Sequence, residues 1–236
     1  MHKLVLGSGG VFFQNESDPL IDHIISLIDD KSDMKMVYFP TGSHDCRGYE
    51  KEVEKYCLNH GFKESVALFL SDESLSEEYI RDTILSASVI YCCGGDLKYV
   101  MEMFSKKNVG KYLREAYDNG VVIAGQSTGS MCFCRLGYDN CGKDGRFMFK
   151  HGLDFIPYIL CPHFEDYPHF RDAVKMQEYD AICIDNDIMM SIVDGEYEII
   201  DSHRNDKHSA WFLKADEDWD IVHDLQKEHI DIPNLR

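Results

Sequence analysis

The sequence predicts an α/β fold in which a mostly parallel central sheet is flanked by helices. Strand-like and helix-like segments alternate through the first half of the chain, as they do when helices connect parallel strands. Two of the junctions between a strand and the following helix are rich in glycine, one at 94–96 and one at 125–129. At 236 residues the chain can form one large domain, and we expect a single domain over 1–236.

Apolar, β-branched runs predict the strands, and apolar residues three or four positions apart predict the helices. The elements predicted in the first half are strands at 4–6, 34–39, 66–70, 87–92 and 121–124, and helices at 19–29, 49–59, 77–85, 97–104 and 110–119. Those predicted in the second half are a surface loop at 136–150, a strand at 156–161, a helix at 170–179, and short strands at 181–184, 189–193, 197–200 and 210–213.

Composition excludes several classes of function. The net charge of −18, from 24 basic and 42 acidic residues, argues against a nucleic-acid partner, because such affinity comes from Lys and Arg at phosphates. Apolar runs are too short to span a bilayer, and the start of the chain is typical of a strand rather than a signal peptide, so we expect a cytoplasmic protein. The nine cysteines form no CxxC pair and are expected to be free thiols, so no metal site is predicted.

The segment Gly125-Gln126-Ser127-Thr128-Gly129 matches the pattern G-x-S-x-G. In this motif a strand turns sharply into a helix and exposes the serine hydroxyl at the turn. The apolar strand 121–124 precedes the motif, which favours a nucleophile over a turn that only packs. The backbone amide of Thr128 could then bind an oxyanion.

A nucleophilic serine requires a base, and two histidines compete for this role. His163 follows the strand at 156–161 and therefore lies at the sheet edge where parallel strands end, as Ser127 does. His169, six residues further on, is the alternative. Gly95 follows the strand predicted at 87–92, the one before the nucleophile strand, and its amide could complete the oxyanion hole. Asp96 could cap the helix that comes next or contact a substrate.

Together, Gly94-Gly95-Asp96, Gly125-Gln126-Ser127-Thr128-Gly129 and Pro162-His163-Phe164 resemble the peptidase E and cyanophycinase family, from the first strand to about residue 200. The resemblance implies a three-layer sandwich of the class I glutamine amidotransferase type and a Ser-His-Glu triad. It implies that Ser127 attacks a peptide carbonyl, that His163 transfers the proton, and that the amides of Gly95 and Thr128 bind the oxyanion, with no cofactor.

The resemblance leaves the acidic member of the triad and the substrate open. The best register places Asn186 where the family has Glu, and a shift of one residue would place Asp185 or Asp187 there. Peptidase E favours peptides that begin with Asp, and Arg171 lies where a substrate-binding arginine of the family is expected, although its position favours an ordinary arginine on a helix surface. The expected partner is a small peptide, and the sequence also allows a homodimer.

Two other functions are compatible with these motifs. An α/β-hydrolase esterase also carries G-x-S-x-G but uses a late histidine, for which His203, His208 and His223 are available. A catalytically silent binding or regulatory protein would account for Asn186 in place of an acid.

Overall fold

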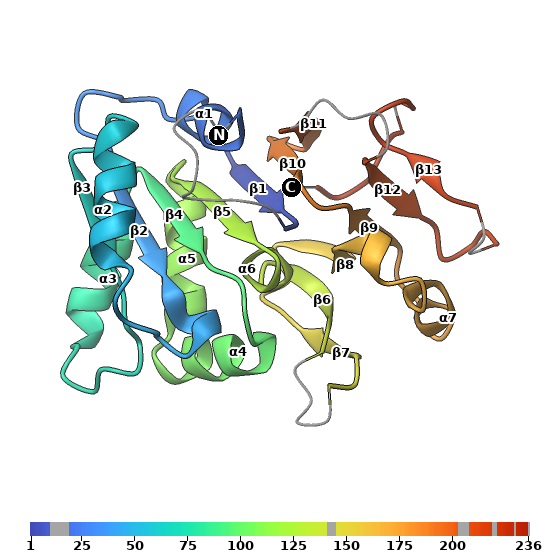
Figure 1. Cartoon of the computed structure of the whole chain (residues 1–236), viewed down its shortest axis with the longest axis horizontal. Helices are drawn as coiled ribbons and strands as arrows, with labels where there is room; N and C mark the ends of the chain where they lie inside the picture. The colour runs from blue at the N-terminus through green and yellow to red at the C-terminus, as the bar shows by residue number, and fades with distance from the viewer. Residues whose placement is uncertain (10–18, 141–144, 203–207, 219–220, 229, 236) are drawn as a thin grey trace.

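The computed structural model describes residues 1–9, 19–140, 145–202, 208–218, 221–228 and 230–235, and its strands form two sheets (Figure 1). The strands of the first sheet are β1 (Lys3–Gly7), β2 (Lys35–Phe39), β3 (Glu64–Ala67), β4 (Val89–Cys92), β5 (Val122–Gln126), β10 (Ile188–Val193) and β11 (Glu196–Asp201). Their spatial order is β11-β10-β1-β5-β4-β2-β3, and β1, β5, β4, β2 and β3 are parallel. This arrangement confirms the predicted α/β class with a mostly parallel sheet.

The helices are α1 (Pro19–Ser26), α2 (Glu50–Asn59), α3 (Glu77–Leu85), α4 (Leu97–Lys106), α5 (Val109–Asp118), α6 (Thr128–Met131) and α7 (Phe170–Val174), with 3₁₀ turns η1 (Pro40–Ser43) and η2 (Phe164–Asp166). Successive side chains of a strand point to opposite faces of the sheet, and here they pack into two different hydrophobic clusters. In β2, Met36 and Tyr38 pack with α1 and α2, whereas Val37 and Phe39 pack with α3, α4 and α5. Helices therefore cover both faces of the first sheet.

The second sheet contains β6 (Cys134–Asp139), β7 (Met148–His151), β8 (Ile156–Pro162), β9 (Ala181–Ile184), β12 (Ala210–Leu213) and β13 (His223–Asp224). It lies beside the helix-flanked sheet in Figure 1, and one hydrophobic cluster contains residues of both sheets, among them Leu4 of β1 and Leu160 of β8. Because of this shared core, the end of β8 lies close to the ends of β1 and β5.

The predicted surface loop at 136–150 is wrong over much of its length. Residues 136–139 belong to β6, and they pair antiparallel with β7, from Leu136 opposite His151 to Asp139 opposite Met148. Leu136 and Tyr138 are buried with Phe170 of α7, which explains why this segment is a strand. The predicted helix at 170–179 is also shorter, because α7 ends at Val174.

Candidate active site

Ser127 lies at a strained turn between β5 and α6. Its φ of 52° and ψ of −118° are unfavourable for a residue with a side chain. The serine amide donates to the carbonyl oxygens of Gly7 (3.0 Å) and Ser8 (2.9 Å), which fixes the turn. A Cβ atom at Gly125 would lie 2.1 Å from the carbonyl oxygen of Gly129, so the chain can pass this close only with glycine here. The structure therefore contains the expected nucleophile elbow.

His163 follows β8 of the second sheet and lies against the elbow serine, whose strand β5 belongs to the first sheet. The two residues therefore meet between the sheets and not, as expected, at one edge of a single sheet. The Nε2 atom of His163 is 2.9 Å from the Oγ atom of Ser127. The backbone of His163 is left-handed, with a φ of 54°, and its amide donates to the Oγ atom of Ser8 over 2.7 Å. The first strand and the second sheet thus hold the imidazole in place together.

The carboxamide of Asn186 lies on the other side of the imidazole. Its Oδ1 atom is 2.5 Å from Nδ1 of His163, and its Nδ2 atom donates to Oδ2 of Asp166 over 3.0 Å. The carboxylate of Asp166 can only accept, so it requires the amide nitrogen to face it and the amide oxygen to face His163. His163 must then carry its proton on Nδ1, which leaves Nε2 free to accept the proton of Ser127.

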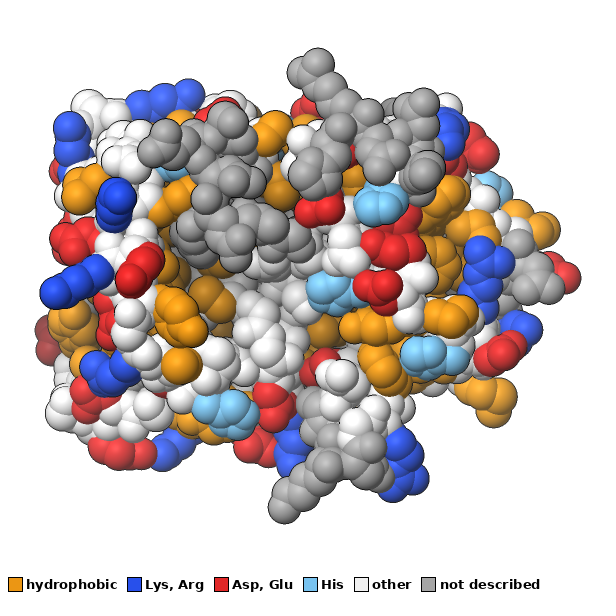
Figure 2. Space-filling view, viewed as in Figure 1, with side chains coloured by type: hydrophobic (Ala, Val, Ile, Leu, Met, Phe, Trp, Pro, Cys, Tyr) orange, Lys and Arg blue, Asp and Glu red, His pale blue; other side chains and the backbone are white. Residues whose placement is uncertain are grey.

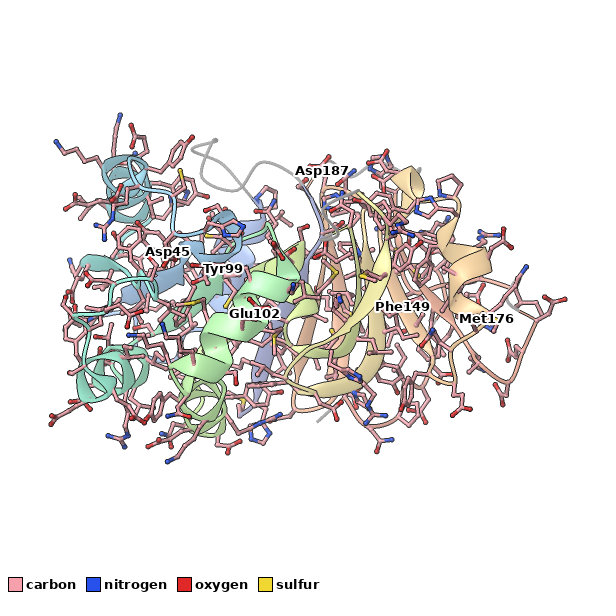
Figure 3. All side chains as sticks on the ribbon, turned by 90° about the horizontal axis from the view of Figure 1, so that it is seen from below. Asp45, Tyr99, Glu102, Phe149, Met176 and Asp187 are labelled. Atoms are coloured by element: carbon pink, nitrogen blue, oxygen red, sulfur yellow. The ribbon has the colours of Figure 1, made fainter. Side chains whose placement is uncertain are left out.

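The two aspartates beside Asn186 have other partners. Oδ2 of Asp185 accepts from the amide of Ser209 (3.0 Å) and the indole of Trp211 (2.9 Å). The amide of Asp187 donates to the carbonyl oxygen of Gly9 over 3.0 Å, and Figure 3 places this residue at the rim of the molecule near the junction of its two halves. Of the three residues considered for the third position, the structure brings Asn186 to His163.

Gly95 and Thr128, the residues expected to bind the oxyanion, lie on the two turns next to each other at Ser127. A Cβ atom on neighbouring Gly94 would be 3.3 Å from Cβ of Ser127, so the glycine turn after β4 lies directly beside the nucleophile. The hydroxyl of Thr128 donates to the carbonyl oxygen of Gly95 over 2.6 Å. The threonine side chain therefore links the two residues whose amides are expected to form the oxyanion hole.

Gly95→Ala should destabilise the protein and lower kcat by about 10²–10³-fold, the cost of losing one oxyanion donor. Gly95 has a φ of 139°, and a Cβ atom there would lie 1.9 Å from the carbonyl oxygen of Gly42. Gly48→Ala is the matched control, because Gly48 also has a positive φ (113°) but nothing lies within 4 Å of its Cβ position. Peptide hydrolysis and urea unfolding of both variants test this, and equal activity of the two would contradict it.

Asp96 and Arg171, the residues predicted to contact substrate, have structural partners. Asp96 caps α4 by accepting from the amide of Tyr99 over 3.0 Å, and its other oxygen lies 3.6 Å from Nε2 of His44. Arg171 lines a surface pocket of about 500 Å³ together with Glu165 and Asp185. An acidic ligand in this pocket would meet two acidic side chains as well as the arginine.

The competing histidines lie elsewhere. His169 packs against aromatic rings, 4.7 Å from that of Phe147. Nδ1 of His208 is 3.1 Å from the carbonyl oxygen of Asn186, and His223 contacts Glu217 at 2.7 Å. His203 lies outside the described residues. The late histidines that are described therefore do not contact Ser127.

Three further residues of the site were not singled out from the sequence: Ser8, Glu165 and Asp166. Ser8 belongs to a glycine-rich segment directly after the first strand, and its position at a strand end was an available signal. Glu165 accepts the amide hydrogen of Asn186 over 2.8 Å, and Asp166 holds the carboxamide. Both acids follow His163 closely in the chain, but only the fold reveals that they meet Asn186.

Glu165→Gln should raise stability at neutral pH. Burial, with a smaller contribution from the charge of Asp185, raises the pKa of Glu165 above its usual value. The folded state therefore binds this proton more tightly than the unfolded state, and stability falls as pH rises through the folded pKa. Glutamine keeps an oxygen for the Asn186 amide but carries no charge. Urea unfolding should show a gain at pH 8 that fades below about pH 4, and a gain that persists in acid would contradict this explanation.

No cluster of three potential metal-ligating His, Cys, Asp or Glu side chains occurs in the described part of the chain. None of the helices described is both long and apolar enough to cross a membrane. A nucleophile elbow with a bonded histidine on this α/β fold defines the class of the protein as a serine hydrolase.

Comparison with known proteins shows which family of hydrolases the chain belongs to. The model of peptidase family S51 matches residues 4–200, and the chain belongs to this family. It is 26% identical over 174 residues to the uncharacterized peptidase YgaJ of Bacillus subtilis (strain 168), covering 72% of this chain and 73% of that protein. These findings confirm the expected resemblance and make the protein a peptidase.

Solved structures share the fold. A peptidase from an acI-B1 Actinobacterium has a TM-score of 0.65 at 17% identity, with 94% of this chain and 96% of that one covered. A candidate peptidase E from Listeria monocytogenes EGD-e has a TM-score of 0.64 at 15% identity, with 85% and 98% covered. At these identities the likeness establishes the fold alone.

Proposed function

We propose that the protein is a serine peptidase that hydrolyses small peptides through an acyl-enzyme on Ser127. The observation that carries this proposal is the 2.9 Å contact between Nε2 of His163 and Oγ of Ser127. A serine hydroxyl is a weak nucleophile at neutral pH unless an adjacent base removes its proton. The site offers such a base at hydrogen-bonding distance and in the required tautomer.

In the first half of the proposed reaction, Oγ of Ser127 attacks the scissile carbonyl carbon and its proton passes to Nε2 of His163. The amides of Gly95 and Thr128 hold the oxygen that becomes negative. The C–N bond then breaks, and the amine leaves with the proton from His163. In the second half, water attacks the ester, gives its proton to His163, and releases the acid as Ser127 regains its proton. These steps use protein groups and water.

Asn186 and Asp166 are proposed to support the charged imidazole. When His163 accepts a proton, Oδ1 of Asn186 receives the hydrogen bond from Nδ1, but an amide stabilises a cation less than a carboxylate does. The negative charge lies one residue further away, on Asp166, which accepts from the same amide at 3.0 Å. The chain thereby keeps an acid coupled to the histidine, although not in direct contact with it.

Preference for an N-terminal Asp stays a prediction that depends on Arg171. Its two acidic neighbours, Glu165 and Asp185, line the same pocket and would repel a second carboxylate. We therefore propose small peptides as the substrate class without an acidic first residue as a requirement.

The alternative is a silent family member that binds peptides without cleaving them. The presence of Asn186 where the family is expected to have Glu favours it. The contact between Asn186 and Asp166 argues for retained chemistry, because a decayed site would not need to hold the carboxamide in the orientation that fixes the His163 tautomer.

The experiment is to treat the purified protein with a small fluorophosphonate and to locate the adduct by peptide mass spectrometry. Oγ of Ser127 forms a bond to phosphorus, fluoride leaves, and the serine proton passes to His163. We expect labelling at Ser127 that falls at least about 100-fold in rate in His163→Ala, since general-base assistance contributes 10²–10⁴-fold. His169→Ala is the control and should be labelled normally. Absence of labelling in the wild type would favour the silent member.

A further inference from the structure

An apolar pocket of about 370 Å³ opens at the ends of β2 and β4, and the mechanism above does not use it. Its walls include Tyr38 at the end of β2, Val53 of α2, and Phe69. Cys93 forms part of the wall nearest the nucleophile; burial raises the pKa of its thiol to about 12, so it is neutral at physiological pH. Figure 2 shows apolar side chains recessed on this face of the molecule. The volume is that of a small-ligand site.

The pocket lies near the active site. Cys93 is followed by Gly94, where a Cβ atom would lie 3.3 Å from Cβ and 3.8 Å from Oγ of Ser127. Pro40 and Ser43 of η1 also line the pocket, and Gly42 of the same turn packs against the backbone of Gly94. The pocket therefore adjoins the same glycine turn that lies beside the nucleophile.

The order of the strands decides which half of the substrate lies there. Ser127 follows β5, which lies between β1 and β4. His163 is held on the β1 side by Ser8, and the leaving amine must lie beside Nε2 of His163 to receive its proton. The acyl half therefore shares the β4 side with the oxyanion held by Gly95, and beyond Gly95 it extends toward β4 and β2, where the pocket opens.

The charges around the pocket disfavour an acidic side chain. The charged residues among its lining are Glu50 and Glu52. The guanidinium of nearby Arg47 lies 4.1 Å from the centre of the Phe69 ring, and Arg47 itself does not line the pocket. An uncharged apolar side chain would displace water from the walls without meeting these carboxylates.

We propose that this pocket binds the side chain of the residue that donates the scissile carbonyl, and that the preferred side chain is apolar, from leucine to phenylalanine in size. The proposal rests on the serine peptidase function proposed above. It names the substrate class for that site, namely small peptides with an apolar acyl residue.

The test uses α-aminoalkyl diphenyl phosphonates, in which the group on the α-carbon imitates the acyl side chain. Oγ of Ser127 bonds to phosphorus, phenoxide leaves, and the serine proton passes through His163 to give phenol. We expect the benzyl compound to inactivate the wild type about 10–100-fold faster than the methyl and carboxymethyl compounds. A small fluorophosphonate without a side chain reports separately on whether Ser127 is reactive.

Variants link the preference to the pocket. Cys46→Trp places an indole at an exposed lining position and should abolish the benzyl advantage, and Tyr49→Ala should weaken it by removing an exposed part of the wall. Leu58→Trp is the matched control, because Leu58 is 54% exposed on α2, whose Val53 lines the pocket, but Leu58 itself does not line it. All three should react normally with the fluorophosphonate.

The outcomes separate the two proposals. Fluorophosphonate labelling of Ser127 without a benzyl advantage, or with faster reaction of the carboxymethyl compound, would overturn the apolar pocket and leave the peptidase intact. If the benzyl compound still reacted faster than the methyl compound with Cys46→Trp, the preference would arise elsewhere in the protein, and the proposed role of the pocket would be overturned as well. Failure of the fluorophosphonate itself would remove the function on which the inference rests.

Discussion

Ser127→Ala should lower kcat/KM for a small peptide by at least about 10⁴-fold, because the acyl-enzyme cannot form and only binding and oxyanion stabilisation remain. Steady-state hydrolysis with an internally quenched dipeptide or tripeptide measures the loss. Circular dichroism should be unchanged, since the hydroxyl supports no other part of the fold. Retention of more than about 1% of wild-type activity would assign the chemistry to another residue.

Ser127→Gly separates catalysis from backbone strain. It should be as inactive as Ser127→Ala, but more stable by about 1–2 kcal/mol, because glycine adopts the φ of 52° at little cost. Urea unfolding of the two inactive variants gives the difference directly. Equal stability would mean that the surrounding structure, rather than the side chain, determines the cost of the turn.

The nucleophile elbow could be predicted because its rule is local. A buried strand, glycines on either side, and a serine between them determine both the sharp turn and the exposed hydroxyl at Ser127. The choice of His163 over His169 could not rest on a shared sheet edge, because β5 and β8 belong to different sheets, and it depended on the resemblance of Pro162-His163-Phe164 to the family motif. These features depend on short stretches of sequence.

The surroundings of the histidine could not be predicted in the same way. Adjacent residues of an extended chain point in opposite directions, so a shift of one position exchanges Asn186 for Asp185 or Asp187. Asp166 is only three residues from His163, yet its contact is with a side chain 20 positions away. The strands β6 and β7 could not be predicted either. Tyr138 of β6 is buried against α7, and the neighbouring sequence, which is rich in polar residues, does not indicate this contact.

Asn186→Ala should lower kcat/KM by about 10³–10⁴-fold, comparable to the loss of the acid from a serine protease triad. Without the carboxamide, Nδ1 of His163 loses its acceptor, the imidazole can adopt the wrong tautomer, and Asp166 loses the group that it orients. The pH profile of kcat/KM should shift as well as fall. A variant that loses less than about 10-fold would show that Asn186 does not orient the base.

Exchanging the amide and the acid tests whether the charge on Asp166 acts through Asn186. In Asn186→Asp alone, two carboxylates face each other across the 3.0 Å contact, so one of them should hold a proton and activity should gain little. In the double variant Asn186→Asp/Asp166→Asn, the net charge is unchanged but the carboxylate bonds directly to His163 and the new amide donates to it.

We expect the double variant to be about 10-fold more active than the wild type and its pH profile of kcat/KM to be displaced, because a full negative charge now adjoins the imidazolium. Asp166→Asn alone should keep the hydrogen bond but remove the charge, which should lower kcat/KM about 10-fold and displace the pH profile in the opposite direction. A purely structural role for Asp166 would change stability in these variants but would leave the pH profile where it is. The pH profile therefore decides whether the acid has been lost from this site or has moved one residue away from the histidine.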